Sequence, residues 1–385
     1  MWDAHRDGMP RRPDACCQFL TLRRHRRPMQ SERSIAMCQE SEDPTAPPSE
    51  LYRQSQVMRA IGTPFVADLL AAVDRQLDNA PLSAALIRSW GSTAASSAIA
   101  MRVNAALHAL ARRGVEPQLA ALYAGRHNRF DEAVALALAS HDEFLVDWLL
   151  RVPQTNEVGR AAALYAALMV LAEEYGHGFE LFEIGASAGL NLNLARYAYD
   201  LGGLKTGEAN STVRIAPAWR GPTPPDAVVT VCAARGVDLH PLDAKDPAAC
   251  ERLAFFVFAD QPERATRLEQ ALDIARRHPP RLDTGDAARW LAAQVAKPGT
   301  DHQHRVALHS MVLQYLRPED RMAIEATLLR AGAAATAARP FACIGFEWDD
   351  ARERVELRLR SWPDGRDRVL AHCHPYGAWI EWLAA

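Results

Sequence analysis

The chain has very little lysine and no cysteine motif. Lys205, Lys245 and Lys297 are its only lysines, and the formal net charge is −3 over 385 residues. So balanced a charge provides no positive field to bind nucleic acid, and we expect no nucleic-acid partner. The seven cysteines are odd in number and never spaced C-x-x-C. This predicts reduced thiols rather than a disulfide framework or a cysteine zinc site.

Long apolar runs are also missing. The longest, Ala161 to Ala172, is about half of what a bilayer-spanning helix needs. The beginning of the sequence does not show the basic, apolar and small-residue order of a signal peptide. We therefore expect a cytoplasmic protein without a membrane partner.

Residues 1–50 differ in composition from the rest. The first 34 are rich in arginine and have almost no apolar periodicity, and "EDPTAPPSE" follows at residues 42–50. We expect a basic disordered tail and a Pro-rich linker. Two alternatives remain open for this segment: a tail that contacts RNA or lipid, and a true start at Met29 or Met37 that would leave residues 1–36 outside the native protein.

Residues 51–153 are predicted to form an all-helical domain that caps the rest. In "SSAIAMRVNAALHALARRG", apolar residues recur at three- and four-residue steps, and Gly114 follows two arginines as at a helix C-terminus. "DEAVALALASHDEFLVDWLLR" has the same composition. No convincing strand is found in this part.

Residues 154–385 alternate between helix and strand patterns. A helix at 159–176 precedes the apolar strand "FELFEIG", a glycine turn and a predicted helix, "LNLNLARYAYD". We predict an α/β fold: a Rossmann-like, mostly parallel sheet closed by an antiparallel C-terminal hairpin. The further strands are expected at 227–239, 305–316, 340–349, 354–362 and 367–382, and the further helices at 246–259, 264–278 and 318–333.

The glycine turn allows two functional interpretations. Gly185-Ala186-Ser187-Ala188-Gly189 fits G-x-S-x-G, the elbow of serine hydrolases, and Asp286 or Asp349 with His372 or His374 follow it in the order of a triad. Such an elbow follows several strands, however, and the upstream half reads as helices. An oxyanion loop is not visible either, beyond His177-Gly178.

The second interpretation is a cofactor turn. Glu183 ends an apolar strand, where an unpaired carboxylate is costly unless a ligand's amine or hydroxyl satisfies it. Gly185 and Gly189 allow a tight turn and a close ligand, and a helix from Leu190 would present free N–H groups. Ser187 stands where dinucleotide fingerprints prefer glycine, which favours a cofactor without a pyrophosphate, such as S-adenosylmethionine. Ala186 and Asn191 complete this predicted lining.

Later residues extend the cofactor interpretation. Asp286-Ala287 follows a short extended segment, similar to the turn that binds adenine in class I methyltransferases. Asp238 or Asp243 is a candidate for the ribose hydroxyls, although a helix cap or turn would explain each acid as well. The strand at 305–316 resembles a fourth strand whose end offers His309, Ser310 and Gln314 to a substrate.

Several blocks together resemble an uncharacterised bacterial family, domain of unknown function 2332. They are "VPQTNEVGRAAAL", "FEIGASAGLNLNLARYAYD", "RGVDLHPLD", "RLEQALDIARRHPPRLDTGDAARWL", "HSMVLQYL" and "SWPDGRDRVLAHCHPYGAWIEW". The resemblance runs from about residue 51 to the end. It implies a helical N-terminal part, a methyltransferase-like Rossmann part and no established activity.

Polar residues before the glycine turn, and histidines after it, complete the candidate site. Asn156 and Arg160 of "QTNEVGR" are candidates to hold the cofactor's carboxylate, Arg160 as a bidentate donor; alternatively this segment only caps a helix. His309 and His374 are candidate general bases. Tyr315, Tyr376 and Trp348 would shape an acceptor pocket. The pairs His302/His304 and His372/His374 lack a third ligand nearby, so we expect no metal.

The sequence thus predicts an S-adenosylmethionine-dependent methyltransferase acting on a small molecule. A non-catalytic module that binds an adenosyl ligand and a serine hydrolase using Ser187 are the alternatives. Neither the acceptor, nor the oligomeric state, nor the occurrence of transfer follows from the sequence, because a fold does not determine a function.

Overall fold

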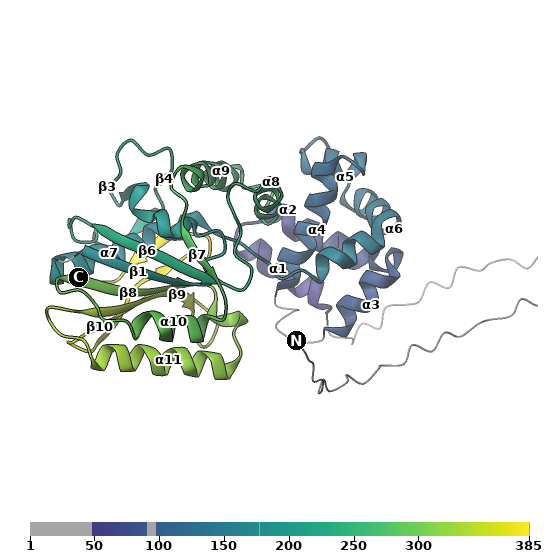
Figure 1. Cartoon of the computed structure of the whole chain (residues 1–385). Coiled ribbons are helices and arrows are strands. Elements are labelled where there is room, and N and C mark those ends of the chain that lie inside the picture. Colours follow the sequence, from purple (N-terminus) through teal and green to yellow (C-terminus); the bar gives the residue numbers. More distant parts are fainter. Residues whose placement is uncertain (1–47, 91–97, 177, 385) are drawn as a thin grey trace, which may run out of the picture. The chain divides into compact units, whose positions relative to one another are not determined.

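The computed structural model describes residues 48–90, 98–176 and 178–384. The predicted basic tail and nearly all of the Pro-rich linker lie outside these residues. Pro48–Ala385 form one compact unit. Its helices and strands are shown in Figure 1.

The first part of this unit is helical. Its helices are α1 (Glu50–Ala60), α2 (Pro64–Gln76), α3 (Pro81–Ser89), α4 (Ile99–Arg113), α5 (Pro117–Tyr123) and α6 (Phe130–Leu149). Helix α4 ends at Gly114 in the left-handed conformation, as predicted. Non-helical backbone angles at His141 mark a kink inside α6. In the described residues up to 151 there is no strand, which agrees with the sequence pattern.

A phenylalanine segment links these helices to the rest of the unit. Phe255, Phe256 and Phe258 belong to the same buried cluster as the apolar faces of α2, α4 and α6. The Asn104 amide of α4 donates a hydrogen bond of 3.1 Å to the Phe255 carbonyl. His108, one turn later, lies against the same carbonyl. The helices are therefore held by packing as well as by specific polar contacts.

The second part contains a nine-stranded sheet among the described residues, in the order β5-β12-β11-β10-β9-β8-β1-β6-β7. The segment β7-β6-β1-β8-β9 is parallel throughout, whereas each neighbouring pair from β9 to β12 is antiparallel. The predicted fold class is confirmed. The bounds are β1 (Gly178–Ile184), β5 (Ala218–Arg220), β6 (Val231–Asp238), β7 (Arg281–Thr284), β8 (Gln303–Ser310), β9 (Phe341–Trp348), β10 (Val355–Trp362), β11 (Arg366–Cys373) and β12 (Trp379–Trp382).

The parallel strands have a doubly wound order. Numbered along the chain they lie as 3-2-1-4-5, so the order reverses between β1 and β8. In open α/β sheets, ligands bind outside the carboxyl ends of the strands at such a reversal. This topology therefore predicts a ligand site at the carboxyl ends of β1 and β8.

Helices pack on both faces of the parallel strands (Figure 1). Helices α7 (Ala161–Tyr175) and α9 (Pro262–Arg277) share a buried cluster with Leu181, Val306 and Ile344. On the other face, α10 (Ala287–Val295) and α11 (Pro318–Ala333) pack with Phe182 and Ala307. Helix α8 (Pro247–Phe255) precedes α9. The alternation of Leu181 and Phe182 between clusters follows from the two-residue period of a strand.

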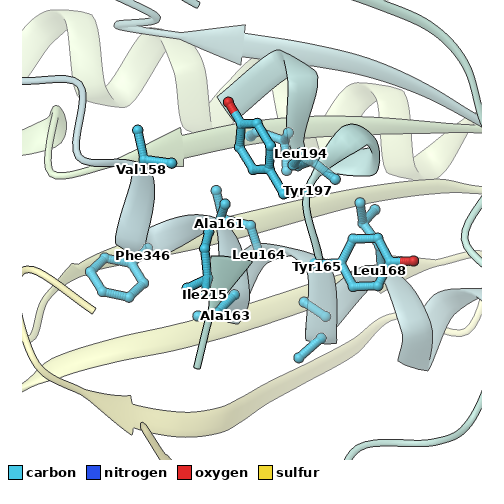
Figure 2. Packing of buried hydrophobic residues seen from close by; sticks show 14 of the residues in the cluster. Val158, Ala161, Ala163, Leu164, Tyr165, Leu168, Leu194, Tyr197, Ile215 and Phe346 are labelled. Atoms are coloured by element: carbon cyan, nitrogen blue, oxygen red, sulfur yellow. The ribbon is translucent and has the colours of Figure 1, made fainter. Parts of the chain in front are cut away.

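Helix α7 is buried almost throughout, which explains its uniformly apolar sequence. Figure 2 shows Ala161, Leu164 and Tyr165 of α7 with Tyr197 and Phe346 in this cluster. The Tyr165 ring also stacks on Tyr199, with ring centroids 4.4 Å apart.

The helix predicted at 190–200 is only partly correct. Leu190–Arg196 form a 3-10 helix (η4), and β2 (Ala198–Leu201) follows directly. Strand β2 pairs with β3 (Leu204–Gly207) and β4 (Arg214–Ile215) in a small separate sheet. The hydroxyls of Tyr197 and Tyr199 donate to the carbonyls of Leu190 and Leu194. These buried contacts favour extended backbone at 197–199 over a continued helix.

The strand predicted at 305–316 is too long as well. Strand β8 ends at Ser310 because Met311 has a φ of 57°, a left-handed conformation that no strand continues through. A short 3-10 helix, Leu313–Tyr315, follows. The loop of residues 311–316 therefore folds over the edge of the sheet instead of extending it.

Candidate functional site

The carboxyl ends of four neighbouring parallel strands bring most of the predicted residues to one edge. Glu183 is near the end of β1, Asp238 ends β6, and His309 is near the end of β8. Asp286 follows β7. In the order β7-β6-β1, an acidic residue thus stands at the end of each of three adjacent strands.

The glycine turn has the tight geometry that the sequence predicts. Gly185 and Gly189 have a φ of 67°, and Ser187 has a φ of 53°. The Ala186 N–H donates to the Val237 carbonyl at 3.0 Å. The Ser187 N–H donates to Oδ2 of Asp238 at 2.9 Å. The turn is therefore fastened to the end of β6.

The space beside the two glycines is filled by the chain itself. A Cβ atom on Gly185 would lie 2.3 Å from a methyl group of Val312, and one on Gly189 would lie 2.7 Å from Pro280. The expectation that both glycines open the backbone to a ligand therefore needs correction. Glycine is required at these positions by the backbone angles and by packing within the chain.

Glu183 is the most perturbed acid at this edge. Its side chain is 2% exposed, and Oε2 has no hydrogen-bond partner in the described part of the chain. Burial raises the pKa of Glu183 to about 8, with Asn191 opposing the rise and the charge of Asp238 adding to it. A buried carboxylate without a full set of partners is costly, so the fold carries this residue at the expense of stability.

Two further polar groups beside Glu183 are buried without partners. Oγ of Ser187 has no hydrogen bond among the described residues. The Asn191 amide forms none of good geometry there, although it lies close enough to Glu183 to oppose the rise of that pKa. These two residues are 4% and 1% exposed. Native proteins satisfy most buried polar groups. Three such residues together therefore indicate either a strained site or a place where a polar ligand completes the bonds.

Asn156 and Arg160 both reach this edge from the segment before α7. Oδ1 of Asn156 accepts the Leu190 N–H at 2.8 Å, so this N–H, which we expected to be free for a ligand, is capped. Arg160 Nε donates to the Pro375 carbonyl at 2.9 Å, and Nη1 donates to the Ser310 carbonyl at 3.3 Å. No carboxylate in the described residues forms an ion pair with Arg160, although its side chain is 6% exposed.

Glu157, which lies between Asn156 and Arg160 in the sequence, forms ion pairs that the sequence does not indicate. Its carboxylate forms an ion pair of 2.6 Å with Arg264 of α9 and a longer one of 3.7 Å with Arg267. Burial alone would raise the pKa of Glu157, but the neighbouring guanidinium groups lower it. This buried cluster fixes the segment that carries Asn156 and Arg160.

The three strand-end acids differ in their contacts. Asp238 accepts N–H groups from Ser187 and His240. Asp243, the alternative for the ribose hydroxyls, is exposed and accepts the Lys245 N–H in a local turn. Asp286 caps α10 by accepting the Arg289 N–H at 2.9 Å, and Ala287 begins that helix. Asp238 lies at the end of β6 and contacts the glycine turn with its own carboxylate. The loop of Asp243 contacts this turn through the Leu242 N–H, which donates to the Ser187 carbonyl at 3.1 Å.

His309 is held by a carboxylate on the neighbouring strand. Its Nδ1 lies 2.9 Å from Oε1 of Glu347. The same oxygen accepts the N–H groups of Val312 and Leu313. Burial alone would lower the pKa of His309, but Cys343 and Glu347 raise it to about 10. The raised pKa favours the protonated ring at neutral pH, which disfavours the predicted role as a general base.

His374 lies further along the edge and next to a cavity. Its Nδ1 accepts the Tyr376 N–H at 3.1 Å, and burial lowers its pKa. His374 thus remains neutral near pH 7. Trp348 and Pro375 line the same cavity. Of the predicted acceptor residues, His374 and Trp348 are therefore brought together there, whereas Tyr315 belongs to the loop after β8.

A serine nucleophile is poorly supported. Strand β1, which precedes Ser187, is the first strand in the described part of the chain. Oγ of Ser187 has no histidine within hydrogen-bond distance there, and an activated serine needs such a base. No group of three or more His, Cys, Asp or Glu side chains in the described ranges is arranged to hold a metal ion.

The fold and this edge place the chain among α/β proteins with a doubly wound parallel sheet and a polar turn at the strand reversal. The chain belongs to the family described as "Uncharacterized protein conserved in bacteria (DUF2332)", whose model matches residues 49–382. Comparisons with curated proteins and with solved structures find no match. None of the helices described is long and apolar enough to cross a membrane.

Proposed function

We propose that this protein binds S-adenosylmethionine along the carboxyl ends of β1, β6 and β7 and transfers its methyl group to a small molecule. The observation that carries the proposal is the row of acids, Glu183, Asp238 and Asp286, on three adjacent strand ends at the reversal of strand order. Class I methyltransferases, which the sequence resembles, hold the methionine, ribose and adenine parts of the cofactor from three such strands.

The buried groups without partners fit the polar parts of this cofactor. Glu183 would accept hydrogen bonds from the methionine amine, which is positively charged at neutral pH. Asp238 would hold the ribose hydroxyls, because each carboxylate oxygen can accept more than one hydrogen bond. Arg160, a buried cation without an ion pair in the described residues, would bind the methionine carboxylate together with Asn156.

The glycine side of the turn fits less well than its polar side. Val312 fills the space beside Gly185, so the cofactor would contact Glu183, Ser187 and Asn191 rather than a bare glycine backbone. Because these three side chains are 4% exposed or less, binding requires an opening of the segments that cover them. The loop of residues 311–316 is the segment in direct contact with Gly185.

The bound cofactor would supply an electrophilic sulfonium methyl group. The protein's own contribution would be to orient the acceptor and to exclude water. His374, which stays neutral, and Trp348 line a cavity that adjoins Arg160 through Pro375. We assign the acceptor to that cavity. His309, held by Glu347, would position the loop of residues 311–316 rather than remove a proton.

Binding of labelled S-adenosylmethionine by equilibrium dialysis tests the proposal. For Asp238→Asn we expect affinity to fall about 10-fold to 100-fold, because a hydrogen bond to a charged group is worth about 1.5–3 kcal/mol. Asp243→Asn is the matched control, since this acid lies five residues further on in an exposed turn, and should bind as the wild type does. Equal loss in both variants, or none in either, would contradict the assignment of Asp238.

The two alternatives give different results. A non-catalytic module would bind the ligand and lose affinity in Asp238→Asn, yet methylate nothing in a pool of candidate acceptors. A serine hydrolase would be labelled by a fluorophosphonate probe, with the label lost in Ser187→Ala. We expect no such labelling.

A further inference from the structure

A cavity of about 630 Å³ lies between the end of α1 and the last strands of the sheet. Its volume is in the range of small-molecule sites. The lining comes from the end of α1 and from β9 to β12 with their connections. The residues are Ala60, Ile61, Trp348, Glu353, Arg354, Val355, His372, Cys373, His374, Pro375, Trp379, Glu381 and Leu383.

Two indole rings form the aromatic part of this cavity. Trp348 and Trp379 are both half-buried. Elsewhere in the described residues, arginine side chains lie over aromatic rings, among them Trp90, Trp148 and Trp290. No such contact is formed with Trp348 or Trp379 in the described chain. Indole faces attract cations most strongly of all aromatic side chains. The ring contact recorded for Trp379 is with His374, at a centroid distance of 6.1 Å, so no protein cation competes for either indole in the described chain.

The charges around the cavity also favour a cation. Glu353 and Glu381 contribute two carboxylates, against the single guanidinium of Arg354 among the lining residues. Glu381 lies 3.8 Å from Nδ1 of His372, which is charged only when protonated. Glu353 forms no ion pair with any residue in the described ranges. An anion would meet these carboxylates without a buried cation to hold it.

The buried part of the lining adds no positive charge. His374 uses Nδ1 to accept the Tyr376 N–H, and burial lowers its pKa. Arg160, on the other side of Pro375, directs Nε to the Pro375 carbonyl and Nη1 to the end of β8. The cavity therefore combines indole faces, carboxylates and neutral imidazole.

We propose that this cavity binds a small organic cation of the alkylammonium class. Carboxylates would hold its charge while the rings of Trp348 and Trp379 cover its alkyl groups. Under the proposed function the acceptor would then be an amine, whose deprotonated form carries the lone pair that accepts a methyl group. This last identification rests on the proposed function, whereas the binding of the cation does not.

Three probes of equal shape and different charge test the proposal on the full chain without any cofactor. Choline is the cation, 3,3-dimethyl-1-butanol its neutral isostere and 3,3-dimethylbutanoate an anion, each titrated by calorimetry. We expect choline to bind about 10-fold more tightly than the neutral isostere, which lies between the effects of an exposed and a desolvated cation–π contact, because both rings are half-buried. The anion should not bind.

Variants locate the binding. Glu381→Gln and Trp379→Leu should each weaken choline about 10-fold. Glu356→Gln is the control, because Glu356 faces His372 from the neighbouring strand but does not line the cavity. Circular dichroism establishes whether each variant is folded. If Trp379→Leu does not fold, Glu381→Gln alone tests the proposal. Equal affinity for choline and its neutral isostere, absence of choline binding, or equal loss in Glu356→Gln would overturn the proposal. Because no S-adenosylmethionine is present, these results do not depend on the proposed function.

Discussion

Replacing Glu183 by glutamine should stabilise the protein at alkaline pH and change little at acidic pH. Burial raises the pKa of Glu183 from 4.5 to about 8. Between these values the folded state keeps a proton that the unfolded state releases. Stability therefore falls as the pH rises through this window, and the loss is complete above about pH 8. Glutamine has nearly the same shape and cannot ionise.

The size of the effect follows from the same two values. A rise of the pKa from 4.5 to about 8, at about 1.36 kcal/mol for each pH unit, corresponds to about 5 kcal/mol at high pH. Because the side chain is 2% exposed, solvent screening reduces this figure little. Relaxation of the surroundings makes it an upper bound. We expect Glu183→Gln to exceed the wild type by about 2–5 kcal/mol at pH 9 and by about 1 kcal/mol or less at pH 5.

Urea unfolding at pH 5, 7 and 9, followed by circular dichroism and by tryptophan fluorescence, measures this difference. Glu180→Gln is the control for removing a negative charge from β1, since Glu180 is 28% exposed and lies 3.5 Å from Arg305. A difference between Glu183→Gln and wild type that stays constant from pH 5 to pH 9, or a variant less stable than wild type at pH 9, would show that the folded state does not raise the pKa of Glu183.

Two further predictions concern the buried pairs that support the edge. Glu157→Gln should lower the free energy of unfolding at pH 7 by about 3–5 kcal/mol, because it leaves the cation of Arg264 buried without its carboxylate. The pKa of Glu157 is lowered in the folded state, so wild-type stability should fall as the pH drops below 4.5. Glu157→Gln should not show this fall, and an equal loss of stability in the variant would contradict the assignment to Glu157. Glu347→Gln should lower the pKa of His309 from about 10, as followed by NMR titration of the ring. The same variant should speed hydrogen exchange at Val312, and unchanged exchange would argue against Glu347 as its anchor.

Sequence periodicity was enough to predict the layered fold. The spacing of apolar residues in α4 and the glycine after it determine that helix, and the apolar run of β1 matches its predicted strand closely. Strand β6 begins only at Val231, four residues after the predicted start, and ends at Asp238. These features depend on neighbours along the chain. The stretch 197–200 is different, because its extended conformation depends on the burial of Tyr197 and Tyr199 against η4 and on pairing with β3.

In the candidate site, too, some features follow from neighbours along the chain and others depend on contacts between distant residues. The topology of alternating strands and helices is sufficient to place Glu183, Asp238 and Asp286 at one edge. Partners that are distant in the sequence were not predictable. Glu157 meets Arg264, 107 residues away, and His309 meets Glu347 on the next strand. No local pattern indicates such pairs, and they are the contacts that determine the charge state of each residue.

The most direct test of the central claim is a calorimetric titration of the full chain with S-adenosylmethionine at pH 7, in two buffers of different ionisation enthalpy. Glu183, whose pKa is about 8 in the free protein, should ionise when it binds the cofactor's ammonium group and release close to one proton. We expect binding with a buffer-dependent enthalpy, and this dependence should disappear in Glu183→Gln. Absence of binding, or binding with the same proton release in that variant, would contradict it.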